Sequence, residues 1–530
     1  MRRRNAAPRG GFSVAVMQYY FYNWVVNARY DLFNGAVLPY EFIAVIERHN
    51  PWWAGKPGHE AGIYPFKRWP FRIIKKRLED GLAPIVVIRG PRQVGKTVLQ
   101  YQVIEELLRE RVRPERILRI QFDELPSFSS TRFKEPIFRI IDWYEKNVLK
   151  STLNEVARKG EPAYLFFDEV QNLPYWAPQL KSLVDNATVR VVATGSSALK
   201  IAAGHDSLAG RITHVDVGPL LLREVAELRG LGRIEPYVAN NNWGVATDID
   251  FWKGLVAFGR ENRVSRDRAF AAFSDRGSYP IAQTKPAIEW AEMAAQLNDK
   301  IIKRVIEHDL RTGEAGRKRD PRLLEEVFTL SARYAGQAPK PSELAREVSR
   351  TLGADVGGPR IANYLGFLDS SLIVKLIPPL EIRLKKKQGP NKITICDHGL
   401  RASWLQEIIP LTPEALDQKP ELTDLAGHLA ENIAGYFLGS IPGIALSWFP
   451  KRTTEPELDF VITIGDRRIP VEVKYRRRID AYRDTEALRT FIERTDYNAI
   501  FGVLVTRDDE GEVIDPRIIC VPLSTLLLLR

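Results

Sequence analysis

The chain has 530 residues, of which 45% are hydrophobic and 27% are charged, and its formal net charge at pH 7 is +11. This length and apolar content predict roughly three or four domains with packed cores, which excludes intrinsic disorder. Its two cysteines exclude a disulfide framework and a cysteine-rich zinc site, and they favour an intracellular, cytoplasmic location. The positive charge favours an anionic partner, such as a nucleotide or a nucleic acid.

The N-terminus combines a basic leader, MRRRNAAPRGG, with an apolar and aromatic stretch, FSVAVMQYYFYNWVV. Gln18 and Asn23 interrupt that stretch, which is shorter than the roughly 20 apolar residues that span a bilayer. No small-residue cleavage site follows it. We therefore expect a segment that is buried or contacts a partner, with no membrane attachment; Met17 is an alternative start of the chain.

The first strong motif lies at residues 83–112 and predicts a strand, a loop and a helix. Ile85 to Ile88 form the continuous apolar run of a buried parallel strand. The loop after it fits GxxxxGK[ST], a pattern whose backbone N–H groups surround phosphate oxygens at a helix N-terminus. We expect Lys96 to reach the β- and γ-phosphates of ATP and Thr97 to bind Mg²⁺. The predicted nucleotide-binding residues are Gly90, Pro91, Arg92, Gln93, Val94, Gly95, Lys96, Thr97 and Val98.

A second buried strand, Tyr164 to Phe167, ends in Asp168 and Glu169. Ligands of α/β sheets bind at the carboxyl ends of strands, so these acids are placed to serve the nucleotide site. We expect Asp168 to bind Mg²⁺ and Glu169 to orient or deprotonate the attacking water.

A third strand ends at Thr194, and Arg211 stands immediately before a fifth strand, residues 212–217. Thr194 is predicted either to hold the attacking water and sense the γ-phosphate or to belong to an ordinary turn. Arg211 is predicted either to be an arginine finger that enters the site of a neighbouring copy, which implies a homo-oligomer, or to be a structural residue.

The order of these motifs resembles that of AAA+ ATPases. More narrowly, NPWW at Asn50 to Trp53, GPRQVGKT, FFDEVQNL, TGSSA and LAGR resemble a group of predicted archaeal and bacterial AAA+ ATPases whose C-terminal domain has no assigned role. The resemblance runs from about Asn50 onward. It implies an N-terminal segment at residues 1–60, an AAA+ core at 61–229 and a helical lid at 230–320.

Residues 321–400 predict a winged helix, because helices are followed by two strands around Gly389. Arg360, Asn363 and Tyr364 fall on the candidate recognition helix. Cations on the wing could neutralise DNA phosphates; the alternative is a winged helix that contacts protein. The predicted wing lysines are Lys385, Lys386, Lys387 and Lys392.

In the predicted C-terminal domain, residues 421–530, a hairpin turning at Gly465 and Asp466 pairs Asp459 with Glu472. Opposed like charges repel, so we expect a divalent cation between them. With Glu431 upstream and Lys474 on the same face, the domain resembles the PD-(D/E)xK nuclease superfamily, which implies that the acids bind Mg²⁺ and the lysine helps to activate water. The alternative is an ion-paired hairpin, Glu457 with Lys474, on an inactive domain.

The sequence thus predicts an α/β multidomain chain with a P-loop ATPase core, a helical lid, a winged helix and a restriction-endonuclease-like domain. The predicted function is Mg²⁺-dependent ATP hydrolysis coupled to action on DNA. The alternative is an ATP-driven switch or protein remodeller whose nuclease-like domain is inactive and only binds a partner.

Overall fold

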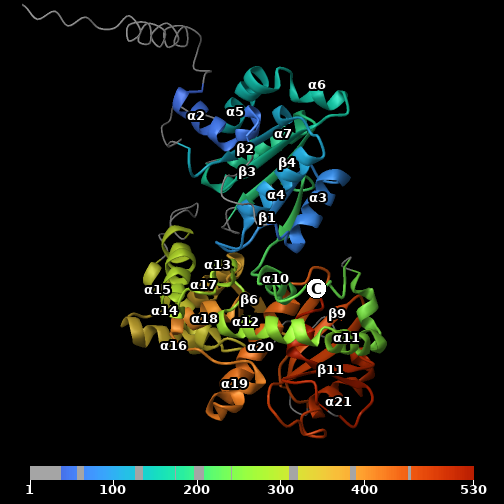
Figure 1. Cartoon of the computed structure of the whole chain (residues 1–530). Helices are drawn as coiled ribbons and strands as arrows, with labels where there is room; N and C mark the ends of the chain where they lie inside the picture. Colours follow the sequence, from blue (N-terminus) through green and yellow to red (C-terminus); the bar gives the residue numbers. More distant parts are fainter. Residues whose placement is uncertain are drawn as a thin grey trace, which may run out of the picture.

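The computed structural model describes residues 38–56, 65–125, 135–173, 175–195, 208–239, 242–309, 320–381, 389–451, 455–511 and 513–530. The basic leader and the apolar stretch after it therefore lie outside the described residues. Figure 1 shows the chain as an upper part, which ends at about residue 217, and a lower part that holds the rest. Within the described ranges, no helix is both long enough and apolar enough to cross a bilayer.

The upper part is built on a five-stranded sheet in the order β2-β3-β4-β1-β5, and every neighbouring pair is parallel. The buried strands predicted at residues 85–88 and 164–167 are confirmed as parts of β1 and β3. Since all five strands run in one direction, their carboxyl ends share one edge. The strands are β1 (Ile85–Arg89), β2 (Ile117–Gln121), β3 (Ala163–Asp168), β4 (Val189–Gly195) and β5 (Ile212–Asp216).

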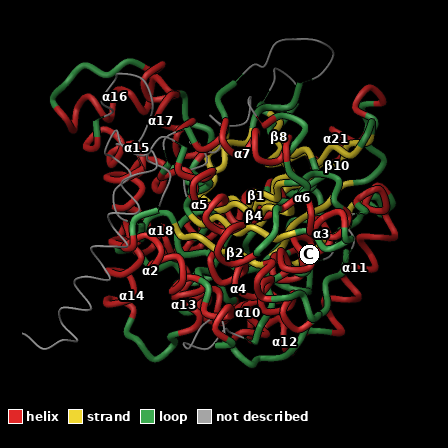
Figure 2. The backbone as a smooth tube through the Cα atoms, turned by 90° about the horizontal axis from the view of Figure 1, so that it is seen from above, coloured by secondary structure: helices red, strands yellow, loops and turns green. Residues whose placement is uncertain are grey.

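Helices cover both faces of this sheet, as Figure 2 shows from above. Alternate strand residues enter two separate apolar cores, one on each face. One face carries α3 (Trp69–Asp80) and α4 (Lys96–Arg109). The other carries α2 (Tyr40–His49), α5 (Pro136–Tyr144), the π-helical η3 (Glu145–Leu149), α6 (Leu153–Arg158) and α7 (Trp176–Asn186).

The NPWW motif lies along the open edge of the sheet, strand β2. The Asn50 side chain donates to the Arg119 carbonyl at 2.7 Å and accepts from the Arg119 N–H at 2.6 Å. The indoles of Trp52 and Trp53 donate to the Ile117 carbonyl at 3.1 and 2.9 Å. These contacts satisfy edge groups that would otherwise offer a template for another strand. The described part of the N-terminal segment is therefore part of the ATPase core.

Most of the described residues in the region predicted as a helical lid, after an irregular stretch at 231–239, are helical. Its helices pack on the C-terminal domain: Arg266 donates to Asp509 at 2.7 Å and to the Thr525 hydroxyl at 2.8 Å. Helix α10 (Leu222–Leu228) precedes this region, whose elements are η5 (Trp243–Thr247), α11 (Ile249–Glu261), α12 (Arg263–Arg276), α13 (Pro280–Thr284), α14 (Trp290–Leu297), η6 (Asn298–Ile302) and η7 (Val305–Asp309).

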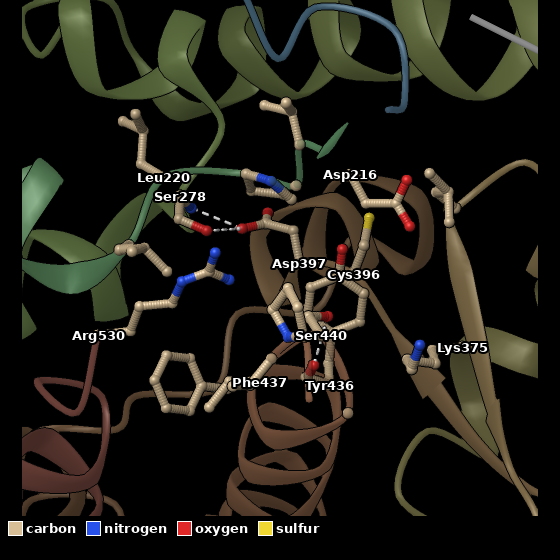
Figure 3. Close-up of a pocket in the computed structure, with 18 of the residues that line it drawn as sticks. Asp216, Leu220, Ser278, Lys375, Cys396, Asp397, Tyr436, Phe437, Ser440 and Arg530 are labelled. Carbon is tan, nitrogen blue, oxygen red and sulfur yellow. Dashed lines mark hydrogen bonds between the residues drawn. The ribbon is translucent and has the colours of Figure 1, made fainter. Parts of the chain in front are cut away.

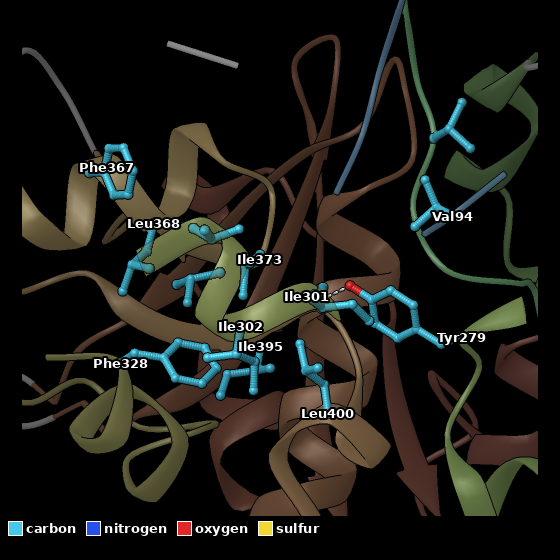
Figure 4. Close-up of a cluster of buried hydrophobic side chains, with 14 of the residues drawn as sticks. Val94, Tyr279, Ile301, Ile302, Phe328, Phe367, Leu368, Ile373, Ile395 and Leu400 are labelled. Atoms are coloured by element: carbon cyan, nitrogen blue, oxygen red, sulfur yellow. Dashed lines mark hydrogen bonds between the residues drawn. The ribbon is translucent and has the colours of Figure 1, made fainter. Parts of the chain in front are cut away.

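The described residues between 321 and 405 contain three helices and an antiparallel strand pair, in the order predicted, and then a further helix that was not predicted. Figure 4 shows part of their apolar core, in which Phe328 and Ile395 lie near Ile302, with Leu400 beside them. The elements are α15 (Pro321–Arg333), α16 (Pro341–Leu352), α17 (Gly358–Ser370), β6 (Val374–Ile377), β7 (Lys392–Ile395) and α18 (His398–Leu405).

The C-terminal domain has a mixed sheet in the order β12-β11-β10-β9-β8. Strands β8 to β10 are antiparallel, and β10 to β12 are parallel. Apart from the 3-10 turn η9, the elements from α20 to β11 follow the order α-β-β-β-α-β, and one more strand and a short helix follow. The elements are α19 (Pro413–Asp417), η8 (Pro420–Leu422), α20 (Thr423–Gly439), β8 (Ala445–Phe449), β9 (Leu458–Ile464), β10 (Arg467–Lys474), α21 (Glu486–Ile492), η9 (Thr495–Tyr497), β11 (Gly502–Thr506), β12 (Ile518–Pro522) and α22 (Leu523–Leu526).

The hairpin register is the one predicted, because Ile464 pairs with Arg467 and Ile462 with Ile469. The pairing continues to Val471 and Phe460, and one step further it places Asp459 opposite Glu472.

Candidate functional site

The phosphate-binding loop connects β1 to α4 at the carboxyl edge of the ATPase sheet. Gly90 has no room for a side chain, because a Cβ there would lie 2.2 Å from the Val217 carbonyl oxygen. Gly95 has φ +90°, which is strained for any residue with a side chain. The Lys96 ammonium donates to the carbonyls of Gly90 and Pro91 at 2.9 and 2.8 Å, so it lies across the loop.

Asp168, at the end of β3, faces that loop. Its Oδ2 accepts a hydrogen bond from the Thr97 hydroxyl at 2.9 Å, and its Oδ1 accepts one from the Thr194 hydroxyl at the end of β4. The two predicted Mg²⁺ ligands of the ATPase core, Thr97 and Asp168, are thus brought together, and Thr194 lies beside them.

Glu169 is the residue after Asp168 and has left-handed backbone geometry, with φ 52°. Its backbone N–H donates to the Thr194 hydroxyl at 3.3 Å, and its carboxylate accepts from the Gln171 amide. A left-handed residue other than glycine costs energy and is concentrated at functional positions.

Arg119 is a site residue that the sequence did not predict. It is 0% exposed and donates to Asp168 Oδ2 at 2.9 Å and to the Gln121 side chain at 3.0 Å. Its guanidinium lies 4.3 Å from the centre of the Tyr101 ring. The available signal was a single cation inside an apolar strand, ILRIQ, because such a charge is rarely buried without a partner.

These residues fit Mg²⁺ and a nucleoside triphosphate. Gly90 has no room for a side chain, Gly95 has left-handed geometry, α4 begins at Lys96, and a hydroxyl and a carboxylate converge as oxygen ligands. Thr97 and Asp168 would hold the metal, which supplies positive charge to the phosphate oxygens. Lys96 would contact the phosphates, and Glu169 would orient water.

Arg211 directly precedes β5, so it lies at the amino ends of the strands, away from the carboxyl ends that carry the phosphate-binding loop. Its guanidinium is paired with Asp185 at the end of α7: Nη2 lies 3.0 Å from Oδ2, and Nε donates to Oδ1. This contact favours the structural role over the arginine finger.

The predicted wing is only partly described. Lys385, Lys386 and Lys387 lie outside the described residues. Lys392 is described and was wrongly placed on an exposed wing: it is 1% exposed and faces the C-terminal domain, because β7 packs on α20. On α17, Arg360 is exposed.

Two further residues of α17 differ in their exposure to solvent. Asn363 is exposed, as a recognition helix requires, whereas Tyr364 is buried and its hydroxyl accepts from the Asp320 N–H at 2.8 Å. Tyr364 is therefore a packing residue.

The predicted residues of the C-terminal domain do come together. Asp459 Oδ2 accepts from the Val473 N–H at 2.8 Å, and Glu472 Oε2 accepts from the Asp459 N–H at 3.4 Å. The Lys474 ammonium donates to Glu472 at 2.5 Å, so its observed partner is Glu472 and not Glu457. Burial and the adjacent Asp459 charge raise the pKa of Glu472 to about 8.

Lys392 joins this cluster of Glu431, Asp459, Glu472 and Lys474. Its ammonium hydrogen-bonds Glu431 and lies 3.5 Å from Asp459 Oδ1 and 3.9 Å from Glu457 Oε1. Burial alone would lower the pKa of Lys392, but Glu431 and Asp459 hold that pKa above its usual range, so the lysine is charged.

A divalent cation does not fit this cluster as it stands. Among the residues with described side chains, no group of three or more His, Cys, Asp or Glu is arranged to hold a metal ion. The Glu431 and Asp459 carboxylates face the Lys392 ammonium instead.

A separate cavity of about 580 Å³ lies where the upper and lower parts meet. Figure 3 shows Asp216, from the end of β5, and Tyr436, Asp397 and Arg530 from the lower part around it. The loop residues Gly90 to Thr97 do not line it.

The sequence matches two family models. Residues 83–226 match a model described as an AAA domain, and residues 270–409 match a domain of unknown function, DUF8612. The second range crosses the boundary predicted between lid and winged helix. Neither range reaches the C-terminal sheet, so they give no support to its nuclease-like assignment.

The chain is also similar to uncharacterized proteins. It is 28% identical over 402 residues to MJ1637 of Methanocaldococcus jannaschii, covering 73% of this chain and 76% of that protein. It is 24% identical over 398 residues to Rv2008c of Mycobacterium tuberculosis, covering 74% and 70% respectively.

One similar solved structure is the Walker-type ATPase PABY2304 of Pyrococcus abyssi, at 16% identity over 65% of this chain and 99% of that one, with a TM-score of 0.35. So low a TM-score adds nothing to the assignment of this chain. The assembled loop, Thr97 and Asp168, together with the match over residues 83–226, make this part of the chain an AAA-type P-loop ATPase domain.

Proposed function

We propose that this protein is a Mg²⁺-dependent ATPase that acts on DNA. The observation that carries the ATPase is the meeting of the Thr97 hydroxyl and the Asp168 carboxylate, 2.9 Å apart, beside the loop that holds Lys96. Lys96 contacts the phosphates, Thr97 and Asp168 hold the metal, and Glu169 acts on the attacking water.

Two variants separate these roles. Lys96→Ala removes a phosphate contact and is expected to lose ATP binding. Glu169→Gln keeps the size of the side chain but removes its basic oxygen, so ATP should bind and remain uncleaved. Nucleotide binding and phosphate release are measured on the full chain. Wild-type turnover by Glu169→Gln would show that Glu169 is not the base.

The DNA part of the proposal rests on charge and position. The net charge is +11, Arg360 and Asn363 are exposed on α17, and the tract Lys385 to Lys387 falls between β6 and β7. The test is ATP turnover with and without DNA, followed by DNA affinity of a variant in which all three tract lysines are alanine. Its affinity should fall on every sequence, and the salt dependence should flatten by up to ~0.9 for each DNA phosphate that the variant no longer neutralises. An unchanged salt dependence would remove the tract from the DNA surface.

A second candidate is supported by Lys392. The C-terminal domain then binds a partner without cleaving DNA, because a lysine faces Glu431 and Asp459, where a nuclease would need a metal. Incubation of DNA with the protein and Mg²⁺, with Lys474→Ala as the control, tests this second candidate. Cleavage that depends on Lys474 would exclude this candidate.

A further inference from the structure

We propose that the Lys392 ammonium is the resident cation of the carboxylate cluster in the C-terminal domain, so that burial of this ammonium in the cluster and binding of a divalent cation exclude each other. This inference is independent of ATP hydrolysis. It concerns a site at which the chain supplies from its own interior the charge that a metal ion would otherwise provide.

The first support is the set of contacts around the ammonium. Lys392 hydrogen-bonds Glu431 and lies within 4 Å of Glu457 and Asp459, and its side chain is 1% exposed. The Lys392 Nζ atom lies 5.1 Å from the centre of the Phe460 ring and 5.5 Å from the centre of the Trp448 ring. A buried ammonium needs paired charges to offset its lost hydration, and the acidic cluster provides them.

The second support is where the lysine comes from. Glu431 is on α20 and Asp459 on β9, but Lys392 is the first residue of β7, on the other side of a connection through α18 and α19. The cation therefore enters the C-terminal domain only when the hairpin is docked on it.

Other contacts hold the hairpin there. The Leu380 N–H donates to the Trp448 carbonyl at 2.7 Å, and the Trp448 indole donates to the Pro390 carbonyl at 3.1 Å. The Ile395 N–H donates to the Asn432 side chain at 2.7 Å. These bonds flank Lys392 on both sides, so its position is fixed by backbone pairing as well as by charge.

A divalent cation bound by Glu431 and Asp459 would lie beside this ammonium. Two like charges in a buried site repel strongly, and the carboxylate oxygens that bind the lysine would have to turn to the metal. Metal binding thus requires the Lys392 ammonium to leave the cluster, against the hydrogen bonds that hold β7 in place.

The experiment compares the wild-type chain with Lys392→Ala and Lys392→Met without nucleotide. The melting temperature is recorded in EDTA and in Mn²⁺, and Mn²⁺ binding is followed by electron paramagnetic resonance. In the wild type, we expect no Mn²⁺ to bind this cluster and no rise in melting temperature that depends on it. Lys392→Ala should melt lower in EDTA and gain both stability and one bound Mn²⁺, because it vacates the cluster.

The other variants are controls. Lys392→Met keeps much of the volume but removes the charge, so it should also gain Mn²⁺ binding, and no gain in either variant would contradict the charge argument. Asp459→Asn added to Lys392→Ala should abolish the gain. Lys419→Ala, at an exposed lysine of the same part of the chain, should behave like the wild type.

The proposal is overturned if Lys392→Ala binds no more Mn²⁺ than the wild type. If that variant does not fold, Glu431→Gln in the wild type decides. A resident ammonium loses its partner in that variant, so its melting temperature in EDTA should fall. A rise would mean that unrelieved repulsion between carboxylates dominates, and it would refute the proposal.

Discussion

Replacing Asn50 by alanine tests the edge contact of the ATPase sheet. Asn50 is buried, and its amide donates to one carbonyl and accepts from one N–H of Arg119. Alanine leaves both of these backbone groups without a partner. An unsatisfied buried group costs about 1–3 kcal/mol, and at about 1–2 kcal/mol for each of the two groups the variant should lose roughly 2–4 kcal/mol of local stability in β2.

The control is Asn154→Ala. Asn154 makes the same pair of bonds, to the Asn186 carbonyl at 2.8 Å and from the Thr188 N–H at 3.0 Å, but in an exposed place where water can replace them. Hydrogen exchange of the peptide at residues 117–121 reports opening of β2. We expect exchange there to accelerate roughly 30-fold to 1,000-fold in Asn50→Ala. An acceleration no larger than in Asn154→Ala would refute the reasoning.

Contacts of the ATPase domain support three further predictions. Arg211→Ala should keep ATP turnover near the wild-type rate, because its guanidinium is already paired; a loss of about 10³-fold would restore the arginine-finger role. Gly90→Ala should abolish ATP-induced thermal stabilisation, because its Cβ would meet the Val217 carbonyl, and normal stabilisation would contradict this. Burial lowers the pKa of His49, so as the pH falls the unfolded state binds a proton before the folded state does. The stability that the neutral His49 contributes is therefore present above about pH 6.5 and is lost as the pH falls below it. His49→Gln should therefore flatten the decrease in melting temperature between about pH 7.5 and 5.5, and an unchanged profile would place the titration elsewhere.

The ATPase core was predictable because its signals are local. Apolar runs such as residues 85–88 predict buried strands, and the glycine loop has a fixed spacing to its lysine. The register at Gly465 and Asp466 followed from turn length alone, and the structure confirms it.

Lys392 shows why the rest could not be predicted. In the sequence it stands beside a lysine tract and alternates with apolar residues, which is typical of an exposed hairpin. Its partners Glu431 and Asp459 are 39 and 67 residues away. A local sequence pattern cannot reveal contacts between residues so far apart in the chain. The lysine is buried only because β7 packs on α20. Arg119 and Asp168, 49 residues apart, are a second case of the same kind.

Arg68 links the phosphate-binding loop to the lower part of the molecule. Its guanidinium donates to the Val94 carbonyl in the loop at 2.7 Å and to the Gly218 and Pro219 carbonyls after β5 at 3.2 and 2.9 Å. It is also paired with Glu224 of α10 at 2.9 Å, and Glu224 is fully buried. Breaking a buried charged pair of this kind is costly because each charge would be left without its partner. Since one guanidinium binds both the loop and the connection into the lower part, neither segment can move away from the other without losing at least one of these bonds. A change in the loop on nucleotide binding would therefore act directly on the connection to the domains below.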